Sequence, residues 1–326
     1  MSDSREIVPH RKSSNSQIVS RIRRQLPKIV QVAGGAAHVA WDEFFEAQIS
    51  NHHTRKNYNH AVRRFLAWCE DRNQELIDIT PGDVGRYIQK LPLAVPTKLL
   101  HLAALRKFFD RMVNRHVIVI NPAATVRGER YSVVEGKTPE IKADQARVLL
   151  QSIDTSTTVG LRDRAILAVL IYTAARVGAV ASLTMTSFAN DGTQYTLRFA
   201  EKGGKSREIP VRHDVERMLL DYIQAAAINS GPLFRTAIRK TKMLTSRSMT
   251  GSDICRMMKR RLKDAGLPTH FSPHSCRVAT VTNLLEQNQS LEAVQHLAGH
   301  ADPRTTRLYD RRGRKITRNL VERISI

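Results

Sequence analysis

The feature that most constrains the fold is a stretch without hydrophobic periodicity, residues 122–140, which separates two regions that have it. Two prolines and two glycines punctuate this stretch, and such residues are typical of loops and linkers. A chain of 326 residues is long enough for two domains, each with its own core. We therefore predict an arm at 1–37, a first domain at 38–121, a linker at 122–140 and a second domain at 141–326.

The region before the break has the spacing of amphipathic helices. Between Tyr58 and Cys69, apolar residues recur at three- and four-residue steps, which places them on one helical face. Thr80 followed by Pro81 is typical of a helix start, with the threonine as N-cap and the proline in the first turn. A further helix follows Pro96. The sequence therefore predicts an all-helical first domain of four helices.

The region after the break combines helical spacing with one hairpin. Residues 195–199 and 207–211 are short alternating runs, and the glycines between them, Gly203 and Gly204, predict the turn. Helical periodicity recurs elsewhere, so the sequence predicts a fold that is mainly α with a small β-sheet. The helices are expected at 163–173, 214–227, 253–265, from 274 onward and at 291–297, with Pro303 limiting the last one.

The charge balance narrows the kind of partner. Lys and Arg total 52 against 30 Asp and Glu, which gives a formal charge of +22. Basic residues are in excess in both predicted domains, and two basic domains favour a polyanion, and hence nucleic acid, over a single solvated basic face. The basic arm lacks the apolar segment of a secretory signal. It is therefore either associated with DNA or a disordered leader.

Two further observations limit the cellular setting. Cys69, Cys255 and Cys276 are too few, and odd in number, for a disulfide framework, which favours a reducing compartment. No apolar run approaches the roughly 20 residues needed to span a bilayer. We therefore expect a cytoplasmic protein with no membrane partner.

The residues best suited to chemistry gather near the C-terminus. His274 and Arg277 form a His-x-x-Arg segment, His300 follows Gly299, and Tyr309 stands nine residues after His300. Two imidazoles, a guanidinium and a phenol in a strongly basic chain fit chemistry on a phosphodiester. No other group of residues in the sequence is a comparably strong candidate for an active site.

Breaking a DNA strand without water as the nucleophile requires an oxygen nucleophile, cations on the phosphate oxygens and a donor for the leaving sugar oxygen. The phenol of Tyr309 can attack, although forming phenolate at pH 7 costs roughly 4 kcal/mol, which a cationic site and a nearby base reduce. Arginine suits the phosphate because it stays charged and offers a planar fork of donors. Arg176 and Lys202 are the upstream candidates. Two arginines could replace Mg²⁺, so we expect no cofactor.

The order Arg, Lys, His-x-x-Arg, Gly-His, Tyr resembles the pattern of the tyrosine recombinase (phage integrase) family, over residues 38–326. Each segment alone is a weak signal, and all five in order are a strong one. The resemblance implies that Arg176 and Arg277 bind the scissile phosphate, and that His300 binds and orients the same phosphate.

The resemblance also implies the proton and covalent steps. Lys202 would be the general acid toward the departing 5′ oxygen, with Lys205 as a nearby rival for this role. His274 would accept a proton from Tyr309 or hydrogen-bond the phosphate. Tyr309 would form a 3′-phosphotyrosyl intermediate, so rejoining would need neither ATP nor metal.

The fold and the partners follow from the same resemblance. The implied fold is a two-domain C-shaped clamp, with a helical core-binding domain before the catalytic domain. The implied partner is double-stranded DNA with inverted half-sites. The family implies a homo-tetramer on two sites, a Holliday junction, a possible accessory directionality factor and a place at the bacterial nucleoid. Integration, excision or resolution of a mobile element is the expected outcome, with chromosome or plasmid dimer resolution as the alternative.

Basic residues interleaved with the apolar helical faces, together with those near the predicted hairpin and on a late helix, are the expected DNA contacts. They are Arg55, Lys56, Arg63, Arg64, Lys98, Arg106, Lys107, Lys205, Lys259 and Arg260.

Other interpretations remain open at this point. His296 and His300 have the i,i+4 spacing of a zinc pair, but no third ligand is evident. A topoisomerase-like enzyme, a non-catalytic DNA-binding protein and an RNA-binding module are the rival functions. Ala179 and Val278 stand where the family often has an acidic residue and a histidine, which predicts altered positioning in the site. The tail at 316–326 is predicted to pack on a neighbouring protomer, or in cis.

Overall fold

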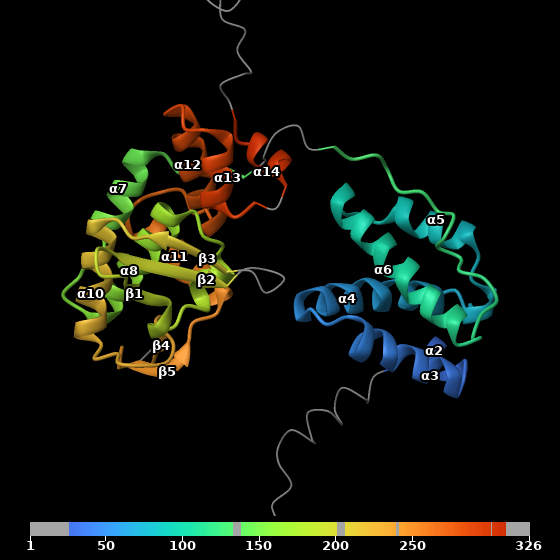
Figure 1. Cartoon of the computed structure of the whole chain (residues 1–326). Coiled ribbons are helices and arrows are strands. Elements are labelled where there is room, and N and C mark those ends of the chain that lie inside the picture. The colour runs from blue at the N-terminus through green and yellow to red at the C-terminus, as the bar shows by residue number, and fades with distance from the viewer. Residues whose placement is uncertain (1–25, 133–137, 201–205, 239–240, 301, 311–326) are drawn as a thin grey trace, which may run out of the picture. The chain divides into compact units, whose positions relative to one another are not determined.

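The computed structural model describes residues 26–132, 138–200, 206–238, 241–300 and 302–310. The chain divides into two compact units, residues 1–132 and 133–326 (Figure 1), and each has its own buried core. Among the described residues, no helix has the length and apolar character required to cross a membrane.

The described part of the first unit is entirely helical, as predicted. Its longest helices, α4 and α6, pack against each other around fully buried aromatic rings, which include Phe65, Phe108 and Phe109. The helices are α2 (Lys28–Val32), α3 (Gly35–Asp42), a π-helix η1 (Glu43–Gln48), α4 (His52–Glu70), a 3₁₀ turn η2 (Leu76–Asp78), α5 (Pro81–Lys90) and α6 (Val95–Asn114).

The predicted helix start at Thr80 is confirmed. Thr80 Oγ1 accepts from the backbone N–H of Asp83 at 3.3 Å, and a carboxylate oxygen of Asp83 accepts from the backbone N–H of Thr80 at 2.9 Å. This reciprocal capping satisfies two donors that the helix itself leaves without partners. Pro81 occupies the first turn of α5.

The first unit begins earlier than the sequence indicated. Ile29 and Val30 on α2, 5% and 0% exposed, belong to the buried core, although both lie in the stretch assigned to the arm. A five-residue helix is too short to show a periodicity. For this reason α2 and the start of α3 were missed, and the unit contains more than the four helices expected.

The second unit is mainly helical with two small antiparallel sheets. The sheets have the orders β1-β2-β3 and β4-β5. Its elements are α7 (Ala143–Gln151), α8 (Thr158–Thr173), α9 (Val177–Ala181), η3 (Met185–Ser187), β1 (Phe188–Asn190), β2 (Tyr195–Ala200), β3 (Ser206–Pro210), α10 (His213–Ala225), β4 (Arg235–Ala237), β5 (Leu244–Ser248), α11 (Gly251–Asp264), α12 (Pro273–Glu286), α13 (Leu291–Ala298) and α14 (Pro303–Arg307).

The predicted strands of the hairpin are confirmed. β2 and β3 pair antiparallel, with Leu197 opposite Ile209 and Ala200 opposite Ser206. Leu197 and Phe199 are both fully buried, because alternate side chains of a strand point to the same face. The predicted turn, with Lys202 and Lys205, lies outside the described residues.

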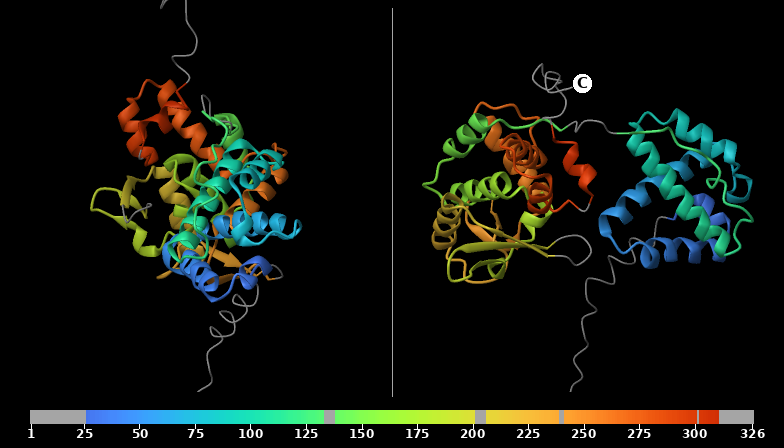
Figure 2. Two further views of the ribbon diagram at one scale, coloured as in Figure 1. Left: turned by 90° about the vertical axis from the view of Figure 1, so that its right-hand side faces the viewer. Right: turned by 45° about the horizontal axis from the view of Figure 1, so that its top comes forward.

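Helix α8 is the centre of the second unit. Residues 165–170 are all 0% exposed, since α10 packs on one side of the helix and α12 on another. A helix that is apolar on every side is buried on every side. In Figures 1 and 2, α12, α13 and α14 (orange to red) lie at one end of the unit, away from the β4-β5 hairpin.

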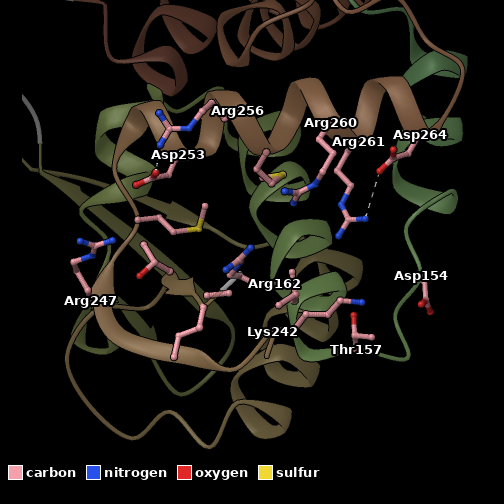
Figure 3. Close-up of a pocket in the computed structure, with 16 residues that line it drawn as sticks. Asp154, Thr157, Arg162, Lys242, Arg247, Asp253, Arg256, Arg260, Arg261 and Asp264 are labelled. Atoms are coloured by element: carbon pink, nitrogen blue, oxygen red, sulfur yellow. Dashed lines mark hydrogen bonds and ion pairs between the residues drawn. The ribbon is translucent and has the colours of Figure 1, made fainter. Parts of the chain in front are cut away.

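The first residues of α8 carry a buried charge cluster. The carboxylate of Asp163, 0% exposed, accepts hydrogen bonds from the guanidinium groups of Arg162, Arg260 and Arg261, at 2.7 to 3.0 Å. These arginines line a cavity of about 640 Å³ between α8, β4-β5 and α11. Figure 3 shows Arg260 and Arg261 extending from α11 toward Arg162. The cluster therefore joins α8 to α11 across this cavity.

Replacing Asp163 with Asn should lower the free energy of unfolding of the second unit by about 3 kcal/mol or more, because three cations would lose their shared buried counter-charge. Urea titration followed by circular dichroism measures this loss. Asp264→Asn is the matched control, since Asp264 is 52% exposed and lies 3.9 Å from Arg261, and it should cost about 1 kcal/mol or less. Equal losses in the two variants would contradict this account.

Candidate active site

Five of the six predicted catalytic residues lie in the described part of the chain, and they come together at one place. Tyr309 Oη is 3.3 Å from His274 Nε2, and the rings of Tyr309 and His300 stack at 5.9 Å. An Nη atom of Arg176 donates to the carbonyl of Gly299 at 3.1 Å. The charge of Arg277 acts on both histidines and on the tyrosine. The sixth residue, Lys202, is outside the described residues.

The end of α8 positions both arginines. Ala174, which follows the last residue of α8, has a left-handed backbone with φ of 50° and ψ of 22°. Its carbonyl accepts from Nη1 of Arg277 at 2.5 Å, and Arg277 is 2% exposed. Two residues further on, Arg176 is exposed at the start of α9. The same turn therefore fixes the buried guanidinium and presents the exposed one.

His274 is held in the first turn of α12, directly after Pro273. Partial burial is the main cause that lowers the pKa of His274, and the positive charges of Arg277 and Arg176 lower it further. The imidazole is therefore neutral at pH 7, and its Nε2 can accept the hydrogen bond from the phenol of Tyr309. A neutral imidazole in hydrogen-bond contact with a hydroxyl is the arrangement that a general base requires.

Tyr309 lies mostly inside the protein, with an exposed fraction of 8%. It belongs to an apolar cluster formed by Ala174, Val278, Val281, Leu285, Val294 and Ala298. Burial raises the pKa of the phenol, and the charges of Arg277 and Arg176 oppose that rise without cancelling it. At pH 7 the tyrosine is therefore a neutral phenol, whose proton must leave during any nucleophilic attack.

His300 is fixed by the turn that ends α13. Gly299 has φ of 62°, a left-handed conformation that glycine adopts without steric cost. Nδ1 of His300 is 2.8 Å from Oγ1 of Thr306, and the side chain of Gln295 donates to the His300 carbonyl at 3.0 Å. Burial, with the charges of Arg277 and Arg176, lowers the pKa of His300 to about 3.

The positions where the family pattern is not followed carry no polar group. Val278 is 2% exposed and packs in the apolar cluster beside Tyr309, while Ala179 is half-buried on α9. Sequence reasoning missed Thr306 and Ala174. Nothing in a single sequence identifies an alanine with a left-handed backbone. Thr306 stands three residues before Tyr309, however, and this closeness to the predicted nucleophile could have made it a candidate.

Several arginines that were expected to contact DNA are engaged within the protein. The guanidinium of Arg106 donates to the carbonyls of Ala123 and Val126, which favours a role in holding the segment after α6. Arg55 donates to the carbonyl of Ile49 at 2.9 and 3.1 Å. The other engaged side chains are Arg63 with Asn59 and Trp41, Lys98 with Glu129, and Arg260 with Asp163.

The remaining basic residues stay predicted DNA contacts. Lys56, Lys107 and Lys259 are exposed, and Arg64 is half-buried. Lys205 lies outside the described residues. As for the zinc alternative, no group of three or more His, Cys, Asp or Glu side chains that could hold a metal occurs in the described part of the chain.

The left-handed turn at Ala174 should tolerate glycine but not valine. In Ala174→Gly, relief of the left-handed strain, about 1 kcal/mol, is offset by the loss of a buried methyl, about 0.8 kcal/mol, so stability should change little. In Ala174→Val, a β-branched residue with positive φ and added core volume should cost about 2 kcal/mol or more. Urea titration of both variants measures the difference, and a stable valine variant would contradict the assignment.

Acid should destabilise the second unit partly through His300. Burial lowers the pKa of its imidazole from 6.5, the ordinary value in an unfolded chain, to about 3 in the folded protein. Its contribution to stability is therefore complete above pH 6.5 and is lost as the pH falls toward 3. In His300→Gln the free energy of unfolding should fall less between pH 7 and pH 5 than in the wild type. His296→Gln, which removes an imidazole outside the buried site, is the matched control, and equal slopes in His300→Gln and the wild type would refute the prediction.

Comparison with known proteins identifies the family of this chain. The model of the phage integrase family matches residues 139–314, and that of the phage integrase N-terminal SAM-like domain matches residues 40–118. Tyrosine recombinase XerD of Listeria monocytogenes is 29% identical over 276 residues, which cover 78% of this chain and 86% of the relative. Tyrosine recombinase XerC of Pelobacter propionicus is 27% identical over 270 residues, 79% and 84% of the two chains.

Solved structures share the fold. XerH recombinase bound to a palindromic difH substrate aligns with a TM-score of 0.63 at 18% identity, over 82% of this chain and 78% of that chain. A lambda integrase tetramer bound to a Holliday junction aligns with a TM-score of 0.60 at 19% identity, over 93% and 89%. The predicted fold class, a helical domain before a mainly helical catalytic domain with small sheets, is confirmed. Since the family models match more than half of the sequence, the chain belongs to the phage integrase family of tyrosine recombinases.

Proposed function

We propose that Tyr309 is the nucleophile of this site-specific DNA recombinase, a member of a family that cuts and rejoins strands through a 3′-phosphotyrosyl intermediate. The observation that carries the assignment is the 3.3 Å contact between Tyr309 Oη and His274 Nε2. In the proposed step Oη bonds to the scissile phosphorus, the bond from phosphorus to the 5′ oxygen breaks, and the phenolic proton passes to His274.

The proposed charge stabilisation comes from two arginines. Arg277 is buried beside Tyr309 and Arg176 is exposed at the same site, and in the proposed complex both guanidinium groups face the phosphate. Fixed cations directed at the phosphate oxygens stabilise the extra charge of a pentacoordinate phosphorus, and arginine matches these oxygens with paired donors. His300 supplies a neutral hydrogen bond to the same phosphate, and Lys202 gives a proton to the departing 5′ oxygen.

The assembly is proposed on the same basis. A palindromic substrate in the XerH structure and a Holliday-junction tetramer in the lambda integrase structure support inverted half-sites and a homo-tetramer for this chain. An accessory directionality factor and packing of the tail at 316–326 on a neighbour remain predictions. Because the substrate is DNA and the named relatives are bacterial, we place the reaction in the cytoplasm, at the nucleoid.

The biological outcome has two candidates. Integration, excision or resolution of a mobile element is the first. Resolution of chromosome or plasmid dimers is the second, and the similarity to XerC and XerD recombinases supports it. A topoisomerase-like reaction, which reseals the same strand, would use the same residues. An assay that contains two DNA sites separates the topoisomerase-like reaction from recombination, because only a recombinase yields exchanged products.

Tyr309→Phe should abolish covalent attachment to DNA and leave DNA binding intact, because the variant loses only the attacking oxygen. The probe is a randomised pool of nicked duplexes, from which denaturing recovery of covalent adducts also identifies the target site. Tyr195→Phe is the matched control: this ring stacks on Phe188 in the small sheet, and the variant should form adducts as the wild type does. Adducts from Tyr309→Phe, or none from the wild type, would overturn the proposed function.

A further inference from the structure

Thr306 contacts two residues of the candidate active site through two different atoms. Its Oγ1 lies 2.8 Å from Nδ1 of His300, and its carbonyl accepts from the backbone N–H of Tyr309 at 3.0 Å. Thr306 lies on α14 and is 0% exposed. Its neighbour Thr305 is half-buried. The hydroxyl of Thr306 is therefore enclosed, with an imidazole nitrogen as its partner.

The direction of this hydrogen bond decides what His300 can do. Burial and the neighbouring arginines keep the imidazole neutral, so only one of its two ring nitrogens carries a proton. A threonine hydroxyl can either donate or accept. If it accepts from Nδ1, then Nε2 presents a lone pair; if it donates to Nδ1, then Nε2 carries the proton.

A phosphate oxygen accepts hydrogen bonds and offers no proton to a lone pair. Nε2 of His300 can therefore bind the phosphate only in the tautomer in which Nδ1 is unprotonated and Nε2 carries the proton. We propose that Thr306 is a positioning residue: its hydroxyl donates to Nδ1 of His300 and thereby fixes Nε2–H as a neutral donor toward the scissile phosphate. The inference rests on the phosphate-binding role proposed above for His300.

The same residue holds the phosphate donor in register with the nucleophile. The rings of His300 and Tyr309 are within 12° of parallel, while the backbone of Thr306 is bonded to Tyr309 and its side chain contacts His300. A shift of α14 would therefore move both groups together. A hydrogen bond to the second ring nitrogen commonly determines which imidazole nitrogen is available for binding.

The tautomer can be read without DNA. The full-length protein, labelled with ¹⁵N-histidine, is studied by NMR at pH 7, and His300→Gln assigns the His300 resonances. We expect an unprotonated Nδ1 and a protonated Nε2 in the wild type. In Thr306→Val the Nδ1–H form should become populated, whereas Thr306→Ser should keep the wild-type tautomer. The inference would be overturned if the wild type carried the proton on Nδ1, or if Thr306→Val had the same tautomer as the wild type.

A second experiment measures the rate of covalent adduct formation under single-turnover conditions. Its substrate is the nicked duplex recovered from the randomised pool. Thr306→Val should form the covalent adduct about tenfold more slowly, the effect of losing one well-placed hydrogen bond. Thr306→Ser should form the adduct at the wild-type rate, because serine keeps the hydroxyl. Thr305→Val is the matched control, and its rate should also equal that of the wild type. An unchanged rate in Thr306→Val would count against the positioning role. If the wild type forms no adduct, the proposed function fails, while the NMR result still tests the direction of the hydrogen bond.

Discussion

The buried guanidinium of Arg277 organises the candidate site. It is among the largest fully buried side chains of the protein, and a charge in such a place is costly unless the fold supplies hydrogen-bond partners. The carbonyl of Ala174 is one such partner, and it faces the arginine because the backbone turns left-handed as α8 ends. The charge of Arg277 also acts on the pKa of each neighbouring titratable side chain, namely His274, His300 and Tyr309.

The site divides its tasks between charge and proton transfer. Positive charge comes from guanidinium groups, which do not lose their protons under ordinary conditions. The imidazoles are kept neutral by burial and by those same guanidinium groups, so they are available to accept or donate single hydrogen bonds. Tyr309 is embedded among aliphatic side chains and meets the polar part of the site through its hydroxyl. The arrangement fits a reaction in which a proton must leave a phenol beside a phosphate.

Much of this could be predicted from the sequence, because the relevant signals are local. Capping residues such as Thr80, the alternation of Leu197 and Phe199, and the apolar run of α8 each determine an element over a few residues. The residue types and their order were sufficient to nominate Arg176, His274, Arg277, His300 and Tyr309, and the structure brings these five together. Their catalytic roles remain proposals.

The rest depended on tertiary contacts. Helix α2 is a single short element whose burial depends on the core it joins. The strands β4 and β5 have no apolar alternation. Arg106 looks like a surface cation in the sequence, yet it reaches carbonyls more than a dozen residues away. Whether a cation faces solvent or supports the backbone depends on which segments the fold places beside it.

The permanent charge of the two arginines has a consequence for how the protein would grip its substrate. A site built on protonated imidazoles would weaken as the medium became alkaline, but the guanidinium charge at Arg277 and Arg176 persists, and both histidines are already neutral. The attraction to a phosphodiester is then regulated by ionic strength, because dissolved ions screen the attraction and counterions released from DNA drive association.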